Sequence, residues 1–88
     1  MKIDSNKKVL ILGASSDIGL KLIEIYLKNQ YKIIAHYNKG NKNFFKLVDS
    51  NKNKIKKIKF NFFSNLNQSE KFLNNKIFKD CSVLINAL

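Results

Sequence analysis

The fold of this chain is decided by residues 9–19, which read Val9-Leu10-Ile11-Leu12-Gly13-Ala14-Ser15-Ser16-Asp17-Ile18-Gly19. A continuously apolar run ends at Gly13, a small hydroxyl-bearing turn follows, and Gly19 opens an amphipathic stretch. This order is typical of a buried strand that passes through a turn into the N-terminus of a helix. Because backbone N–H groups at such a turn can face a phosphate, the segment predicts a nucleotide as ligand.

The residue types in this segment fit that prediction. Gly13 can adopt a backbone geometry that a Cβ atom would forbid, and Gly19 lets the first helical turn pack closely on the strand. Ser15 and Ser16 are small, and their hydroxyls are expected to donate to phosphate oxygens. Asp17 is expected to be the helix N-cap. The helix dipole adds about half a positive charge at the same place.

The rest of the chain alternates between strand-like and helix-like apolar patterns. Strands are predicted at residues 8–12, 31–37, 54–63 and 83–86, and helices at residues 17–29, around 44–50 and at 67–75. Such alternation over 88 residues indicates parallel βαβ units, and right-handed crossovers give the strand order 3-2-1-4. We therefore predict an α/β fold, a single partial Rossmann-like doubly wound domain over residues 1–88 with about four strands and three helices.

The net charge of +11 raises the question of a nucleic-acid partner. All 17 basic residues are lysine, so the arginine fork that reads bases and phosphates in two-point contacts is absent. Lysine, asparagine, isoleucine and phenylalanine are abundant and have AT-rich codons, which offers another origin for the charge. We interpret the lysines as a solvated surface and expect no specific nucleic-acid partner.

The lengths of the apolar runs and the number of cysteines indicate in which cellular compartment the protein is expected. No apolar run approaches the ~18–20 residues that cross a bilayer, and residues 9–12 are too short for the core of a signal peptide. The lone Cys81 cannot form an internal disulfide, and it is expected to be a small packed residue rather than a nucleophile. The sequence thus predicts a cytoplasmic protein without a membrane partner.

The turn resembles the cofactor turn of the short-chain dehydrogenase/reductase family, which often reads Thr-Gly-Ala-Ser-Ser-Gly-Ile-Gly. Residues 13–16, Ile18 and Gly19 match that run. Leu12 stands in place of the threonine, and Asp17 stands in place of the middle glycine. A second resemblance lies at residues 82–88, which are similar to the family's Asp-Val-Leu-Val-Asn-Asn-Ala-Gly. Here Asn86 matches the first asparagine, and Ala87 replaces the second.

The resemblance implies a nicotinamide dinucleotide, with NADP(H) favoured over NAD(H). In NAD-binding folds of this type, an acidic residue about 20 positions after the turn holds the ribose 2′-hydroxyl of NAD. Asn38 lies close to that position in this chain. No Asp or Glu occurs from residue 25 to 48, and Lys39 and Lys42 are nearby. The implied cofactor-binding residues are Gly13, Ser15, Ser16, Asp17, Ile18, Gly19, Tyr37, Asn38, Lys39, Phe63, Asn86 and Ala87.

Two further residues of this region have open interpretations. His36 is expected to be a strand residue that faces a helix rather than a ligand or a base. In the family an acidic residue near the adenine follows the third strand, but Phe62 stands at that place and Asn61 is its neighbour. Phe63 is then either part of the adenine pocket or part of the core.

The family's chemistry uses a Ser, a Tyr and a Lys that would lie beyond position 88. None of Tyr26, Tyr31 and Tyr37 begins a Tyr-x-x-x-Lys run, so no catalytic residue and no metal ligand is assigned. We interpret the chain as the N-terminal, truncated cofactor-binding portion of an oxidoreductase, inactive alone. Its full-length parent would be a homo-oligomer acting on a small carbonyl or alcohol substrate.

Three other interpretations stay open. The chain could be a non-catalytic or vestigial nucleotide-binding protein. The turn could also belong to another doubly wound fold, such as a response-regulator or flavodoxin-like domain. A basic anion-binding protein is the third alternative.

Overall fold

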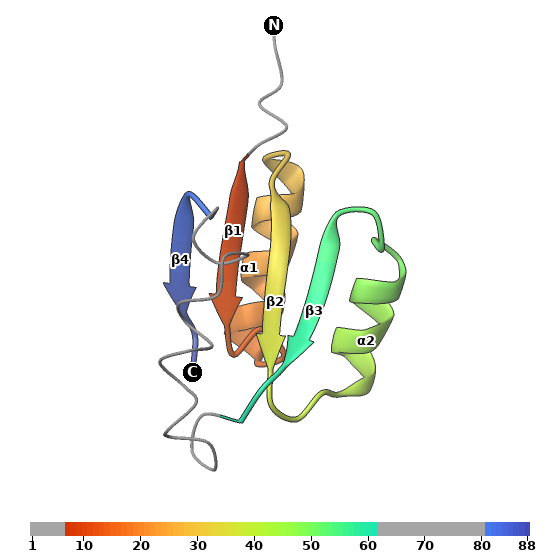
Figure 1. Cartoon of the computed structure of the whole chain (residues 1–88). Coiled ribbons are helices and arrows are strands. Elements are labelled where there is room, and N and C mark those ends of the chain that lie inside the picture. Colours follow the sequence, from red (N-terminus) through yellow and green to blue (C-terminus); the bar gives the residue numbers. More distant parts are fainter. Residues whose placement is uncertain (1–6, 62–80) are drawn as a thin grey trace, which may run out of the picture.

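A computed structural model describes residues 7–61 and 81–88, which form a parallel sheet with two helices packed on one face (Figure 1). The strands are β1 Lys8–Leu12, β2 Lys32–Tyr37, β3 Ile55–Lys59 and β4 Val83–Asn86. The helices are α1 Asp17–Lys28 and α2 Lys42–Asp49.

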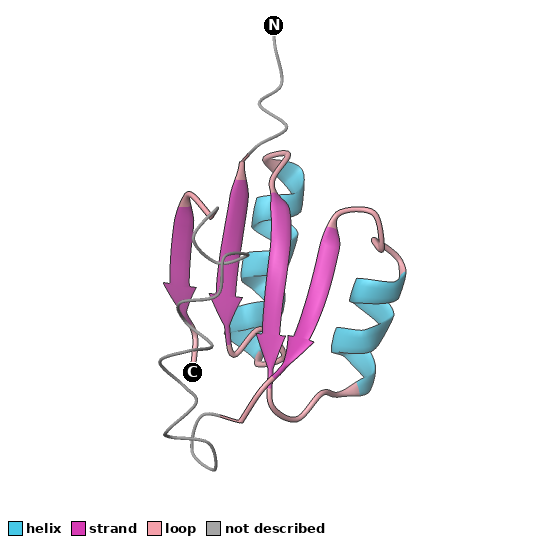
Figure 2. Ribbon diagram, in the orientation of Figure 1, coloured by secondary structure: helices cyan, strands magenta, loops and turns pink. Residues whose placement is uncertain are grey.

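The strand order is β3-β2-β1-β4, with every neighbouring pair parallel. This confirms the predicted α/β class and the predicted order 3-2-1-4. Helix α1 connects β1 to β2, and helix α2 connects β2 to β3 (Figure 2). Both helices contribute buried residues to one core on the same face of the sheet. Because all strands run the same way, the segments that follow β1, β2 and β4 meet at the carboxyl edge of the sheet.

The face of the sheet that contacts the helices holds the larger core. Successive side chains of a strand point to opposite faces, and every second residue of the strands enters this core. Ile23 of α1 and Phe44 of α2 pack against these strands and are fully buried. The buried strand residues of this helix-side core are Val9, Ile11, Ile33, Ala35 and Ile55.

The opposite face of the sheet carries a smaller apolar cluster. It consists of Leu10, Leu12 and Ile34, with Ile58 and Cys81 packed against them. We call these five residues the far-side cluster. The half-buried position of Cys81 within it confirms the prediction of a packed cysteine.

Two predicted strands begin or end elsewhere in the structure. Strand β2 begins at Lys32 rather than at residue 31, and β3 spans Ile55–Lys59 rather than 54–63. The alternating Lys and Ile residues of β3 form the ladder with β2, and Phe60 N–H adds one more bond to Tyr37 O at 2.9 Å. The predicted helix at 67–75 and residues 62–63 lie outside the described residues, so two of the three predicted helices are described.

Helix α1 ends at Lys28, one residue before the predicted end at residue 29. Its C-cap is Asn29, and Gln30 follows with a φ of 66°, the left-handed conformation that commonly ends a helix. Neither of the two described helices is long and apolar enough to cross a membrane.

Two isoleucines on the same helix test this packing. Ile23 is fully buried, whereas Ile25 is 52% exposed. Ile23→Ala should lower the free energy of unfolding by about 2–5 kcal/mol, because it removes buried apolar surface and leaves a cavity. The control Ile25→Ala should change it by less than about 1 kcal/mol. Urea unfolding followed by circular dichroism measures both, and equal losses would contradict the assigned face of α1.

Candidate functional site

The candidate site is an open hollow of about 370 Å³ at the carboxyl edge of the sheet. It lies among the turn after β1, the loop after β2 and the residues after β4, which Figure 1 places at one end of the sheet. Its volume is at the low end of the range of ligand pockets. The lining residues are Gly13, Ser15, Ser16, Asn38, Lys39, Asn41, Ala87 and Leu88.

Gly13 is the residue at which the chain leaves β1. Its φ is +74°, and a Cβ atom there would lie 2.8 Å from the carbonyl oxygen of Ala87. Ala87 N–H also donates to Leu12 O at 2.8 Å, so the end of β4 lies directly against the turn. Both the backbone conformation and the close approach require glycine here.

Gly19 brings the first turn of α1 onto the β1 turn. A Cβ atom on Gly19 would lie 2.6 Å from the carbonyl oxygens of both Gly13 and Ala14. The helix N-terminus can therefore sit this close to the turn only because residue 19 has no side chain. This agrees with the role expected for Gly19 from the sequence.

Ser16, not Asp17, is the N-cap of α1, so the prediction for Asp17 is wrong. The Ser16 hydroxyl oxygen accepts from Gly19 N–H at 3.0 Å and donates to Gly13 O at 2.9 Å. Asp17 is the first residue of the helix, is exposed, and adds a negative charge at the positive end of the helix dipole.

The two serine hydroxyls, which are expected from the sequence to donate to phosphate, each donate to a backbone oxygen in the structure. Ser16 donates to Gly13 O, and Ser15 Oγ donates to Lys39 O at 3.0 Å. Each hydroxyl has one hydrogen, and both are used inside the chain. The serines therefore shape the turn, and the donors left for an anion are backbone groups.

Asn41 joins the loop after β2 to the turn after β1. Its amide nitrogen donates to Ser15 O at 2.8 Å, while its amide oxygen accepts from Phe44 N–H at 2.9 Å as the N-cap of α2. One side chain thus caps a helix and holds two loops together. Asn41 is not among the residues predicted from the sequence, although an Asn three residues before an apolar helical pattern is a recognisable N-cap signal.

His36 supports the turn from inside the sheet. The His36 side chain is fully buried. It lies on the same face of the sheet as its β3 partner Ile58, which belongs to the far-side cluster. His36 therefore does not face α1 or α2, and the expectation that it faces a helix is wrong for these two helices. Gly13 N–H donates to His36 Nδ1 at 3.1 Å, and Nε2 lies 2.8 Å from Phe60 O. Ala14 N–H donates to the backbone oxygen of His36 at 2.8 Å.

These contacts define the protonation state of His36. Nδ1 accepts a hydrogen bond and Nε2 faces a carbonyl oxygen, so the ring is neutral and carries its proton on Nε2. Burial lowers the pKa of His36 below its usual 6.5, and the hydrogen bond to Phe60 opposes that shift. A second proton would place a donor against Gly13 N–H.

Three backbone N–H groups of the turn remain available to a ligand. Those of Ser15, Asp17 and Ile18 donate no hydrogen bond within the part of the chain that the structure describes. Two of them belong to the first turn of α1, where the helix leaves its N–H groups unsatisfied. Lys39 is exposed at the same edge. The site therefore offers an anion backbone donors, a helix dipole and the exposed Lys39 ammonium group.

The structure brings together only part of the predicted set. Six predicted residues line the hollow: Gly13, Ser15, Ser16, Asn38, Lys39 and Ala87. Five others lie outside the lining: Asp17, Ile18, Gly19, Tyr37 and Asn86. Phe63 lies outside the described residues. Leu88, which lines the hollow, was not predicted from the sequence.

Two of the predicted residues outside the lining are engaged elsewhere. The Tyr37 ring packs against Phe44 and Phe45, with centroid distances of 5.0 and 5.5 Å. The side-chain oxygen of Asn86 accepts from Leu88 N–H at 3.0 Å. Tyr37 therefore anchors α2 to the sheet, and Asn86 shapes the segment that lies against Gly13.

Within the described ranges, no three His, Cys, Asp or Glu side chains gather into a possible metal site. Comparison of the chain with protein-family models, with curated proteins and with solved structures found no significant match.

The protonation state of His36 gives a pH-dependent stability. In the folded protein the pKa of His36 lies below 6.5, so near this pH the unfolded chain binds more protons than the folded chain. The contribution of neutral His36 to the free energy of unfolding is complete above pH 6.5. It is lost as the pH falls from 6.5 toward the pKa of His36 in the folded protein. The loss is at most about 1.4 kcal/mol per pH unit, the limit for one proton.

Urea unfolding of the native protein and of His36→Gln between pH 5 and 8 measures this effect. His36 is the chain's single histidine, so the variant should lack this pH slope. Equal slopes in the two proteins would contradict the assignment. If the variant does not fold, imidazole nitrogen NMR of the native protein gives a second readout, with a titration midpoint expected below pH 6.5.

Proposed function

We propose that this chain binds the diphosphate and adenosine ribose of a nicotinamide dinucleotide, with NADP(H) favoured. The observation that carries the proposal is the turn from Gly13 to Gly19 at the carboxyl edge of a parallel sheet ordered 3-2-1-4. In open α/β sheets, ligands bind outside the carboxyl ends of the strands, and a diphosphate takes the helix N-terminus next to the first strand.

The residues present fit such a group. The glycine conformation at Gly13 and the missing side chain at Gly19 keep the turn free of Cβ atoms where a diphosphate would approach. The N–H groups of Ser15, Asp17 and Ile18 would donate to its oxygens. Asp17 adds an unfavourable negative charge at this turn, and its exposed position lets the carboxylate stay in solvent.

The preference for NADP(H) rests on the loop after β2. Asn38 and Lys39 line the hollow, and no acidic residue occurs between positions 25 and 48. A carboxylate here would hold the 2′-hydroxyl of NAD and repel a 2′-phosphate. The Lys39 ammonium would instead attract the phosphate as a point charge.

We further propose that the chain is the N-terminal portion of an oxidoreductase similar to the short-chain dehydrogenases/reductases. The cofactor would supply hydride chemistry on a carbonyl or alcohol substrate. These 88 residues contain no Tyr-x-x-x-Lys run, so proton transfer would belong to residues outside them. The compartment would be the cytoplasm, and the parent would be a homo-oligomer.

The alternative is a nucleotide-binding protein without catalysis, which shares the same turn. The reading frame downstream of codon 88 separates the two. A Tyr-x-x-x-Lys run in that frame favours the oxidoreductase, whereas a natural stop codon directly after Leu88 favours the non-catalytic protein.

Calorimetric titration with NADPH and NADH tests the cofactor proposal. The native chain should bind both saturably and NADPH more tightly. The double variant Asn38→Asp/Lys39→Ala should weaken NADPH binding about tenfold or more, because a charge-assisted contact is replaced by repulsion. Its affinity for NADH should rise, because the new carboxylate can accept from the 2′-hydroxyl.

Lys42→Ala is the matched control, since it removes one exposed positive charge nearby but outside the lining of the hollow. It should leave the NADPH to NADH ratio unchanged. Absence of saturable binding by a folded native chain would overturn the nucleotide proposal. Unchanged affinities in the double variant would overturn only the preference for NADP(H).

A further inference from the structure

A second hollow lies at the opposite, amino edge of the sheet and is lined mainly by lysines. Its volume is about 290 Å³. Five lysines line it, and the buried Ile33, Ile34 and Ile55 are beside them. The five are Lys8, Lys32, Lys52, Lys54 and Lys56. No acidic residue is among the residues that line this hollow.

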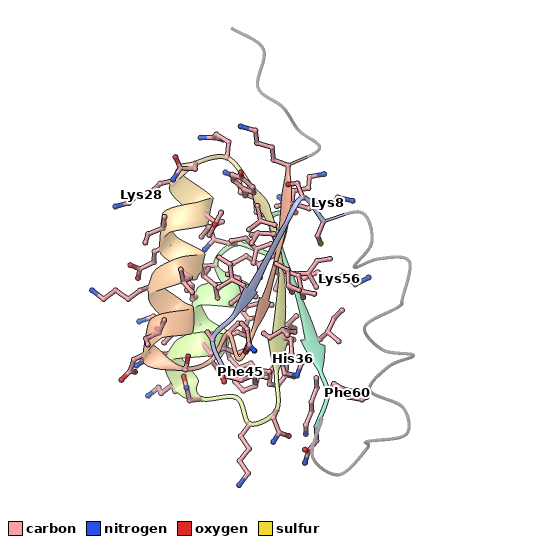
Figure 3. The ribbon with its side chains drawn as sticks, turned by 90° about the vertical axis from the view of Figure 1, so that its left-hand side faces the viewer. Lys8, Lys28, His36, Phe45, Lys56 and Phe60 are labelled. Atoms are coloured by element: carbon pink, nitrogen blue, oxygen red, sulfur yellow. The ribbon has the colours of Figure 1, made fainter. Side chains whose placement is uncertain are left out.

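Three of these lysines share one face of the sheet because of strand register. Lys8 pairs with Lys32 across β1 and β2, and Lys56 pairs with Ile34 across β2 and β3. Lys8 and Lys32 are each two residues before a member of the far-side cluster, Leu10 and Ile34, so all three lysines point to the far-side face. Figure 3 places Lys8 and Lys56 on the side of the sheet away from α1.

The turn before β3 extends this arrangement. Ile33 N–H donates to Lys54 O at 2.8 Å, so Lys54 lies beside the start of β2. Neighbouring strands lie about 4.8 Å apart, which brings Lys8, Lys32 and Lys54 into a row across three strands. We call Lys8, Lys32, Lys54 and Lys56 the lysine row.

No ion pair within the described residues neutralises the lysine row. The acids that the structure describes are Asp17, Glu24 and Asp49, and none lines the hollow. Like charges on adjacent strands repel and destabilise a sheet. Lys57 points to the opposite, helix-side face and is not part of the lysine row. Its Nζ atom lies 5.1 Å from the centre of the Phe45 ring. Among residues 7–61 and 81–88, the lysine row therefore concentrates positive charge without an acidic partner over a buried apolar base.

We infer that the lysine row is a binding site for a compact oligophosphate anion. Five lysines line one hollow, and each ammonium group can donate to a different phosphate oxygen. Lysine binds phosphate as a point charge, whereas planar carboxylates favour the arginine fork that this chain lacks. The apolar strands beneath the hollow keep water from one side and so strengthen the attraction.

This site is separate from the proposed nucleotide site. The lysine row is at the amino ends of β1 and β2, whereas the Gly13 turn follows the carboxyl end of β1. The two sets of lining residues have no member in common. Anion binding at the lysine row can therefore be tested independently of nucleotide binding at the Gly13 turn.

Calorimetric titration with inorganic tripolyphosphate at fixed ionic strength tests the inference. The native chain should bind it saturably at one site. The triple variant Lys8→Gln/Lys32→Gln/Lys56→Gln should bind it at least about tenfold more weakly, because three charge-assisted contacts are lost. Without ligand, this variant should melt no lower than the native protein, because repulsion across the strands is relieved.

The matched control is Lys21→Gln/Lys28→Gln/Lys46→Gln, which removes the same charge from exposed positions on α1 and α2. Figure 3 places Lys28 on the helix side of the molecule. This control should change the affinity less than about twofold, the effect left to long-range charge after screening. An excess of NADPH should not displace tripolyphosphate from the native chain.

Three results would overturn the inference. The first is equal weakening in the two triple variants, which would mean diffuse attraction by net charge. The second is loss of tripolyphosphate binding in Lys39→Ala, which would place the anion at the carboxyl edge. The third is tighter binding of a single-stranded oligonucleotide that increases with its length, which would indicate a nucleic-acid surface.

Discussion

The support that β2 gives to the turn after β1 is the contact on which the candidate site depends. Ala14 N–H donates to the backbone oxygen of His36, and Gly13 N–H donates to the His36 ring. The same ring reaches Phe60 O beyond the end of β3. One buried residue thus fixes the positions of three chain segments at the carboxyl edge, and the hollow takes its shape from them.

The two proposed anion sites, at opposite edges of the sheet, differ in the groups that would attract the ligand. At the carboxyl edge, the attraction would come from backbone N–H groups, the dipole of α1 and the exposed Lys39, because the serine hydroxyls donate within the chain. At the amino edge it would come from side-chain ammonium groups that strand register places together. Backbone donors are fixed in direction, whereas lysine side chains adapt to the ligand. The first arrangement suits a ligand of defined shape, and the second suits one defined mainly by charge.

The sequence predicted the sheet well because its signals are local and repeated. The bounds of β1 and β4 agree with the predicted residues, and the strand order follows from right-handed crossovers alone. Strand β3 is shorter than predicted, because an apolar run does not reveal where pairing with β2 stops. The cap of α1 was placed one residue late, since Ser16 and Asp17 are both good N-caps by residue type.

In the sequence, Gly13 follows an apolar run and Gly19 opens an amphipathic stretch. These two positions were sufficient to determine a strand, a turn and a helix in that order. Local residue types also determined which faces of the strands and helices are apolar, since burial follows a fixed periodicity. Only the tertiary structure decided that His36 supports the turn, that Asn41 joins two loops, and that Lys8, Lys32 and Lys56 of the lysine row share one face. These contacts join residues far apart in the chain, and their geometry depends on strand register and close packing, which single-residue preferences do not encode.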